Sequence, residues 1–178
     1  MLFTLSPHPD FPSRAVSAIE VHADRQHGDT LSLRFGVSGT LDEVVWPAPA
    51  MPGRSDELWK HSCFEAFIGG NEADYREVNV APSHRWASYA FEGYRSGMRE
   101  AGAVEVRASA WSLSDGAAEL AASVWVADMP GDWRLGLSAV IEEKGGARSF
   151  WALRHPAGKP DFHHADCFAA VLPAPSRP

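Results

Sequence analysis

Residues 58–91 read LWKHSCFEAFIGGNEADYREVNVAPSHRWASYAF, and polar and apolar residues alternate in three short segments of this stretch. Alternation with a period of two is typical of β-strands, and it predicts strands at 63–68, 75–80 and around 85–91. The segments between them are rich in glycine, proline, asparagine and serine, which favour tight turns. The stretch therefore predicts three consecutive antiparallel strands.

The side chains that share a face of this sheet follow from the register. Residues directly opposite in an antiparallel pair lie on the same face, and a slip by one residue reverses the faces. Only one register places the apolar residues of the first strand beside the valines of the second. That register brings Glu65 beside Glu77 or Asn79. Adding the third strand, we expect one surface to carry Glu65, Glu77, Asn79 and Tyr89.

The remainder of the chain contains further segments with the same alternation. Strands are predicted at 16–22, 31–37, 104–110, 120–126, 135–141, 150–153 and 167–172. No long amphipathic helix is indicated between them. About nine or ten strands without crossover helices predict an all-β fold of antiparallel sheets packed as a sandwich or jelly roll. Residues 1–172 would form this single domain, and residues 173–178 a flexible tail.

The composition excludes several classes of partner. The chain has 178 residues, of which 45% are hydrophobic and 22% charged, as in an ordinary globular protein. Its net charge of -7 argues against a nucleic-acid partner, because phosphate-binding proteins carry basic surfaces. No apolar stretch approaches the roughly 20 residues of a membrane helix, so we expect no membrane partner. The N-terminus lacks the pattern of a signal peptide, which predicts a cytoplasmic protein with Cys63 and Cys167 reduced.

Three segments of the chain resemble a known family. They are LWKHSCFEAFIG at 58–69, YREVNVAPSHRWASYAFEGYRSGM at 75–98 and SFWALRHPAGKPDFHH at 149–164. These segments are similar to the DOMON-like proteins related to the family 9 carbohydrate-binding module, and the resemblance runs from about Leu31 to the end. It implies an immunoglobulin-like β-sandwich whose relatives bind sugars or haem and usually perform no chemistry.

The resemblance also implies which residue types bind the ligand. In the sugar-binding relatives, aromatic rings enclose a sugar and polar groups contact its hydroxyls. We therefore expect a non-catalytic module that binds a small saccharide or a sugar-containing metabolite in a tryptophan-lined cleft. The candidate ligand-binding residues are the tryptophans near irregular segments, the polar residues of the predicted surface and the neighbouring histidines: Trp59, His61, Glu65, Glu77, Asn79, Trp86, Tyr89, Trp151, His155, His163 and His164.

Three alternatives remain open at the level of sequence. The histidines of 155–164 could ligate a non-covalent haem, since no CxxCH attachment motif occurs. The same loop has the histidine and aspartate composition of a zinc site, which would suit a metal-dependent hydrolase, although no regular ligand motif marks one. Glu65 and Glu77 could form a catalytic acid pair. The pattern favours instead two acids bridged to Arg76, Arg85 or Arg107, with no catalytic residue and no bound cofactor.

Overall fold

Short β-strands joined by turns make up nearly all of the regular structure. The computed structural model describes residues 1–26, 28–127 and 129–175. The strands in these ranges are β1 (Leu2–Pro7), β2 (Val16–Gln26), β3 (Thr30–Gly39), β4 (Gly53–Arg54), β5 (Cys63–Gly69), β6 (Tyr75–Val80), β7 (Arg85–Phe91), β8 (Arg99–Glu100), β9 (Val104–Ser114), β10 (Ala117–Val126), β11 (Trp133–Glu142), β12 (Arg148–Ala152) and β13 (Ala170–Leu172). Three short 3-10 helices accompany them: η1 (Leu41–Glu43), η2 (Leu58–Lys60) and η3 (Ala165–Cys167).

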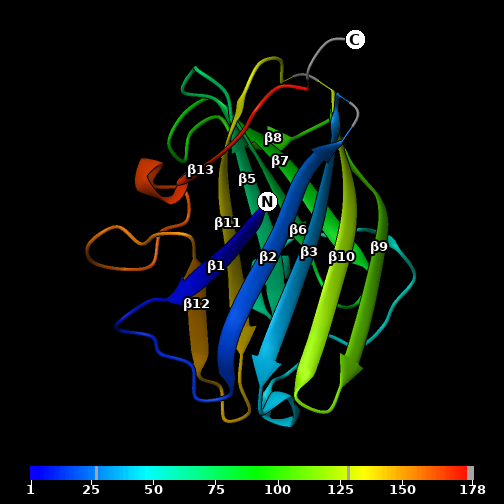
Figure 1. Ribbon diagram of the computed structural model, residues 1–178, viewed down its shortest axis with the longest axis vertical. Helices are drawn as coiled ribbons and strands as arrows, with labels where there is room; N and C mark the ends of the chain where they lie inside the picture. The colour runs from blue at the N-terminus through cyan, green and yellow to red at the C-terminus, as the bar shows by residue number, and fades with distance from the viewer. Residues whose placement is uncertain (27, 128, 176–178) are drawn as a thin grey trace.

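The strands form one continuous sheet that curls until its two halves lie face to face. The order is β4-β7-β6-β5-β11-β12-β1-β2-β3-β10-β9, with β13 beside β11 and β8 beside β7. β1 joins the halves, because its residues 2–5 pair with β2 while Ser6 and Pro7 pair with β12. In Figure 1 the front layer, β2, β3, β10 and β9, crosses in front of the back layer, which contains β5, β6, β7, β11 and β12.

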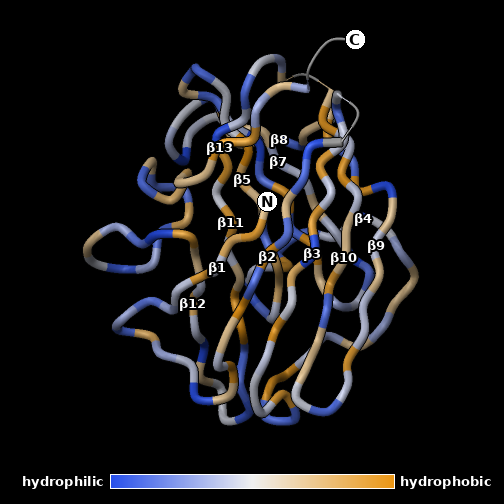
Figure 2. Tube along the Cα trace, in the orientation of Figure 1, coloured by the Kyte–Doolittle hydropathy of each residue, from blue (hydrophilic) through white to orange (hydrophobic). Residues whose placement is uncertain are grey.

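The main core fills the space between the two layers. Phe35 of β3 and Phe64 of β5 are both buried, and their ring centroids lie 5.1 Å apart across this space. Apolar and polar residues alternate along the front strands (Figure 2), so each of these strands has one buried face and one face toward solvent. This pattern is the one expected for an antiparallel layer that packs on one side only.

The back layer is covered on both faces. Every residue of β5 and β6 is buried, although their sequences alternate. A second apolar cluster, which includes Phe67, Tyr89, Phe91 and Phe162, lies on the outer face of this layer. The cluster packs beneath two segments that we call the covering segments, residues 54–62 and 153–168. These segments and the sheet border a partly open space outside the main core.

The all-β prediction is confirmed, and its details need correction. The sheet has 13 strands among the described residues, not nine or ten, and it is mixed because β4 pairs with β7 in parallel. β4 and β8 have two residues each, which is too short to show a period of two. β1 is not among the predicted strands, because the closely spaced prolines at positions 7, 9 and 12 argue against a strand. In the structure β1 ends at Pro7, so most of its hydrogen-bonded residues precede the prolines.

The chain ends close to the sheet. The amide of Ala174 donates a hydrogen bond to Asp132 Oδ1 at 2.8 Å, so at least this part of the predicted tail is attached. Residues 176–178 of that tail lie outside the described residues. Among the described residues, no helix has the length and apolar character needed to cross a membrane.

Candidate functional site

The register predicted from side-chain parity is the one observed. Glu65 of β5 faces Asn79 of β6, and Glu77 of β6 faces Tyr89 of β7. All four side chains therefore lie on the outer face of the back layer, while Phe64 and its apolar neighbours point into the main core. The local sequence is sufficient to explain this arrangement, because the strands follow one another directly and any other register would bury the charged face between the layers.

A cavity of about 340 Å³ opens between this face and the covering segments. The two glutamates and Val140 of β11 belong to the sheet, and Trp59 and Phe162 come from the covering segments. The described residues that line it are Trp59, Glu65, Glu77, Phe91, Arg95, Met98, Val140, Phe150, Pro160, Phe162 and His163. The volume is at the lower end of the roughly 300–1,000 Å³ typical of small-molecule sites, so the cavity suits a small ligand.

Both glutamates are almost completely buried, at 3% exposure for Glu65 and 5% for Glu77. Ser138 Oγ donates to Glu65 Oε2 at 3.1 Å, and Asn79 Nδ2 donates to Glu77 Oε1 at 2.7 Å. Burial, and then the charge of Glu77, raise the pKa of Glu65 to about 8. Burial also raises the pKa of Glu77 to about 7, although the hydrogen bond from Asn79 acts in the opposite direction. The sheet thus holds two acids that ionise with difficulty.

The expected arginine bridges to these acids are absent from the described part of the chain. Arg76 pairs with Asp74 at 3.0 Å, and Arg107 lies over the Trp125 ring on the front layer. The reason is again parity, because Arg76 and Glu77 are adjacent in β6 and point to opposite faces. Parity does not exclude Arg85, but the basic side chain paired with Glu77 among the described residues is that of His163, so the predicted arginine bridges are not observed.

His163 is held in one orientation above Glu77. The amide of Arg95 donates to Tyr75 Oη at 3.3 Å, and Tyr75 Oη lies 2.8 Å from His163 Nδ1. The arrangement that satisfies all three groups has the tyrosine hydroxyl donating to Nδ1, which leaves the proton on Nε2. Nε2 lies 3.7 Å from Glu77 Oε2. Burial, and then the charge of Arg95, lower the pKa of His163 to about 4, so its ring is neutral near pH 7.

Asp161 connects the two loops at the mouth of the cavity. It accepts hydrogen bonds from the Arg95 guanidinium at 2.8 Å, from the Tyr94 hydroxyl and from the His163 amide at 3.2 Å. Although burial acts in the opposite direction, the hydrogen bonds from Tyr94 and Arg95 hold the pKa of Asp161 below its ordinary value. This carboxylate therefore fixes the loop around 92–98 to the covering segment 153–168, in addition to the contacts of Tyr75 with Arg95 and His163.

Only one of the three predicted stacking tryptophans lines the cavity. Trp59 is partly buried there, and its ring packs edge-on against Tyr89 with centroids 6.0 Å apart. Trp86 packs against the main core on the other face of the back layer, opposite Val80. Trp151 is 3% exposed in the same core, and its indole nitrogen donates to Ser149 Oγ. Trp86 and Trp151 are therefore core residues in this structure, which corrects their predicted place in the cleft.

The remaining candidates surround the cavity without lining it. Asn79 is fully buried beneath Glu77, and Tyr89 supports Trp59 while its hydroxyl donates to Asp56 at 2.6 Å. His61 is exposed and pairs with Glu142 at 2.7 Å. His155 Nε2 lies 2.8 Å from the Ser6 carbonyl oxygen, and His164 accepts from the Asp166 amide at the start of η3. The structure thus groups Trp59, Glu65, Glu77 and His163, with Asn79 and Tyr89 directly behind them.

Several lining residues were not predicted. Phe91 could have been found, because it has the same parity in β7 as Tyr89. Val140 and Phe150 face each other across the β11–β12 pair, and β11 reaches the site only by pairing with β5. That contact joins segments far apart in the sequence, and no local pattern indicates it. Within the described residues, no group of three or more His, Cys, Asp or Glu side chains is placed to hold a metal ion.

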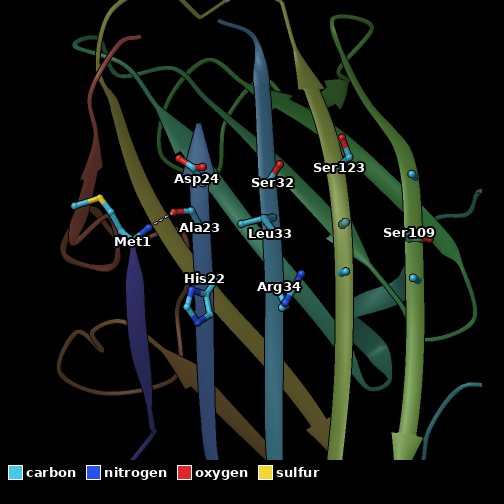
Figure 3. A pocket seen from close by; sticks show the side chains of 13 residues that line it. Met1, His22, Ala23, Asp24, Ser32, Leu33, Arg34, Ser109 and Ser123 are labelled. Atoms are coloured by element: carbon cyan, nitrogen blue, oxygen red, sulfur yellow. Dashed lines mark hydrogen bonds between the residues drawn. The ribbon is translucent and has the colours of Figure 1, made fainter. Parts of the chain in front are cut away.

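A second, wider hollow lies on the outer face of the front layer. It has a volume of about 730 Å³, and Figure 3 shows Ser32 and Ser123 on neighbouring strands with His22 and Arg34 near them. The N-terminal ammonium of Met1 donates to the Ala23 carbonyl at its rim, at 2.8 Å. No tryptophan, tyrosine or phenylalanine is among the described residues that line it. We therefore locate the candidate site in the cavity of the back layer, where rings and buried polar groups converge.

Comparison of the sequence with protein families and with curated proteins found no match. Comparison of the structure found proteins of the same fold. A provisionally assigned carbohydrate-binding protein from Bacteroides uniformis ATCC 8492 aligns with a TM-score of 0.67 at 13% identity, over 97% of this chain and 85% of the other. The fold of this chain is therefore shared with a β-structured protein that is described as carbohydrate-binding.

Two further structures identify the fold more closely. They are of a family 9 carbohydrate-binding module from Caldicellulosiruptor kristjanssonii. The complex with cellotriose aligns with a TM-score of 0.52 at 10% identity, over 89% of this chain and 74% of the other. The complex with glucose aligns with a TM-score of 0.53 at 10% identity, over 94% and 80%. The predicted relation to the family 9 fold is confirmed, and the DOMON-like part of the resemblance stays a prediction.

Proposed function

We propose that the protein is a non-catalytic module that binds a small saccharide in the cavity of the back layer. The observation that carries the proposal is the convergence of Trp59, the buried acids Glu65 and Glu77, and three phenylalanines on one partly open space. Sugar rings have apolar faces that suit aromatic walls, and hydroxyl groups that donate well to carboxylate oxygens. The fold shared with family 9 carbohydrate-binding modules supports the same class of ligand.

The size and chemistry of the site indicate weak to moderate affinity. A sugar face that covers about 100 Å² of aromatic surface would contribute about 2.5 kcal/mol at roughly 25 cal/mol per Å². Hydrogen bonds to the buried carboxylates add to this, and the loss of ligand freedom offsets part of it. Dissociation constants between about 1 mM and 1 μM are therefore expected. The lining lacks a second tryptophan among the described residues, so a two-sided indole sandwich is not part of the proposal.

The proposal is tested by calorimetric titration with a panel of mono- and disaccharides. Binding should be lost in Trp59→Ala and retained in Trp125→Ala, because Trp125 lies on the outer face of the front layer beside Arg107. Retained binding in Trp59→Ala, or no response to any sugar by the native protein, would argue against the site. Titration with hemin separates the alternative of haem binding, which would give a sharp, shifted Soret band and no heat with sugars.

A further inference from the structure

The cavity contains more negative than positive charge. Glu65 and Glu77 line it, and Arg95 is the only arginine or lysine among the lining residues that the structure describes. The Arg95 guanidinium is paired with Asp161 at 2.8 Å, and its charge also acts on Glu77, whose pKa it lowers against the larger effect of burial. His163, the histidine above Glu77, is neutral near pH 7 because burial and Arg95 lower its pKa. When ionised, the two glutamates therefore place two negative charges beside one arginine that Asp161 already pairs, so negative charge is in excess among the described residues that line the cavity.

The hydrogen bonds of the glutamates are also incomplete. Their donors are uncharged: a serine hydroxyl for Glu65 and an asparagine amide for Glu77. Within the described residues, Glu65 accepts through Oε2 alone, although its side chain is only 3% exposed. Asn79 Oδ1 is also buried without a partner, but it lies behind Glu77 and Asn79 does not line the cavity, so a ligand there does not reach it. The carboxylate oxygens of Glu65 and Glu77 are the acceptors that a ligand in the cavity can use.

The walls of the cavity suit a cation better than they suit a second anion or a purely neutral group. Trp59, Phe91, Phe150 and Phe162 contribute their rings. The faces of such rings attract ammonium groups, by about 0.5–2 kcal/mol depending on how far the cation is removed from water. An ammonium group also carries three donors and no acceptor, which matches a floor of acceptor atoms.

We propose that the cavity is selective for an amino sugar, a saccharide whose protonated amino group occupies the space between Glu65 and Glu77 while its ring lies against Trp59. This inference rests on the proposed saccharide-binding function and specifies its substrate class. The volume of about 340 Å³ leaves room for a small ligand only, so a monosaccharide or short amino sugar is the expected occupant. An ammonium group between the two acids would favour their ionised forms and gain a charge-assisted contact, with release of their protons to water, whereas a neutral sugar leaves the acids protonated; this difference is the physical basis of the selectivity.

Calorimetric titration with three matched monosaccharides tests the proposal. Glucosamine carries an ammonium group where glucose carries a hydroxyl and N-acetylglucosamine a neutral amide. Glucosamine should bind at least about tenfold more tightly than glucose, and N-acetylglucosamine should show no such gain. Equal binding of all three within about twofold would overturn the selectivity and leave the saccharide site intact. No binding of any of them would remove the proposed function, and the inference with it.

Charge-removing variants provide the second test. Glu65→Gln and Glu77→Gln keep the size of the side chain, and each should reduce the preference for glucosamine over glucose to within about threefold while glucose still binds. Glu105→Gln is the matched control, because Glu105 is exposed in β9 on the front layer. If both cavity variants keep the full preference, the acids do not bind the amino group and the proposal is wrong. NMR spectra of the backbone amides show whether each variant is folded. If one variant does not fold, the other still gives the comparison.

Discussion

Glu65 and Glu77 are diagonal neighbours rather than direct partners: Glu65 faces Asn79, two residues beyond Glu77 in β6. Like charges directly opposite each other in a sheet are destabilising, and diagonal positions are about 7–8 Å apart between Cα atoms. This offset leaves each acid with its own neutral donor, Ser138 for one and Asn79 for the other. It also leaves space at the floor of the cavity for a ligand group between the carboxylates.

The buried acids should make the protein less stable as the pH rises. Burial raises the pKa values of Glu65 and Glu77 from 4.5 to about 8 and about 7. Between pH 5 and 8 the folded state therefore holds protons that the unfolded state has released, so the free energy of unfolding falls as the pH increases through this window. The expected loss is about 1.4 kcal/mol for each unit by which folding raises a pKa. Urea denaturation at a series of pH values measures it.

The variants isolate the contribution of the acids. Glu65→Gln should flatten the decline between pH 5 and 8, and at pH 8 it should be at least as stable as the native protein, since no charge has to be buried. Glu105→Gln should reproduce the native profile, because that residue is exposed. A native stability that stays constant or increases between pH 5 and 8, unchanged by Glu65→Gln, would show that the acids are already ionised in the folded protein.

The sequence predicts those residues of the site that lie on consecutive strands, and it does not predict residues that come from distant segments of the chain. β5, β6 and β7 are consecutive, and their alternation is enough to place Glu65, Glu77 and Tyr89 on one face. The same parity puts Trp86 on the opposite face, next to Val80, so its assignment to the cleft contradicts the pattern that locates the acids. In the sequence-based prediction Trp86 is assigned to the cleft because it is a tryptophan. Its position in β7, however, decides which face of the sheet it occupies.

The other half of the cavity depends on contacts that no local pattern encodes. Phe150 and Trp151 are adjacent in β12, and which of them faces the cavity is decided by the pairing of β12 with β11 and of β11 with β5. The pairing puts Phe150 opposite Val140 on the outer face and Trp151 opposite Ala139 in the main core. The pairing of β1 with β12, which closes the sheet, is not predicted from local patterns either, because it joins residues 6 and 7 to residues 151 and 152.

Truncation of Trp151 in the main core and of Trp59 at the cavity should have different effects on stability and binding. Trp151→Ala removes a buried indole from the main core and should destabilise the protein by about 3–5 kcal/mol. Trp59→Ala removes a partly buried ring at the cavity and should cost less stability while abolishing saccharide binding. Urea denaturation and calorimetric titration of both variants give the comparison. A folded Trp151→Ala protein that has lost binding with unchanged stability would reverse the assignment.

His163 should remain neutral well into the acidic range. Its lowered pKa of about 4 means that the ring carries no charge at pH 6, and the hydrogen bond from Tyr75 to Nδ1 fixes the proton on Nε2. The ¹⁵N shifts of the ring, followed from pH 8 to 5, should show an accepting Nδ1 and a protonated Nε2 throughout. In Tyr75→Phe the Nδ1 resonance should move, because its donor is gone. A titration midpoint near pH 6.5 for the native ring would contradict this account.

Asp161 should control the order of the cavity mouth more than the stability of the fold. It holds Arg95, Tyr94 and the His163 amide together, and the Arg95 side chain is 52% exposed. The Asp161 side chain is 18% exposed and accepts several hydrogen bonds, so Asp161→Ala should lower the free energy of unfolding by about 1–2 kcal/mol, less than the loss of a core side chain. Amide hydrogen exchange should become faster around 92–98 and 155–164, and saccharide affinity should fall because the cavity walls are less fixed.

A matched ion pair in the same loop makes this prediction specific. Glu92 and Arg99 lie 3.6 Å apart, are more exposed than the Asp161 pair and do not contact the covering segment 153–168 through any described ion pair. Glu92→Ala should therefore leave both the exchange of residues 155–164 and saccharide affinity unchanged. If Asp161→Ala behaves in the same way as Glu92→Ala, the carboxylate does not organise the mouth. If only Asp161→Ala accelerates exchange and weakens binding, the order of the cavity mouth depends on this carboxylate beyond the contacts that Tyr75 and Tyr94 also make between the two segments.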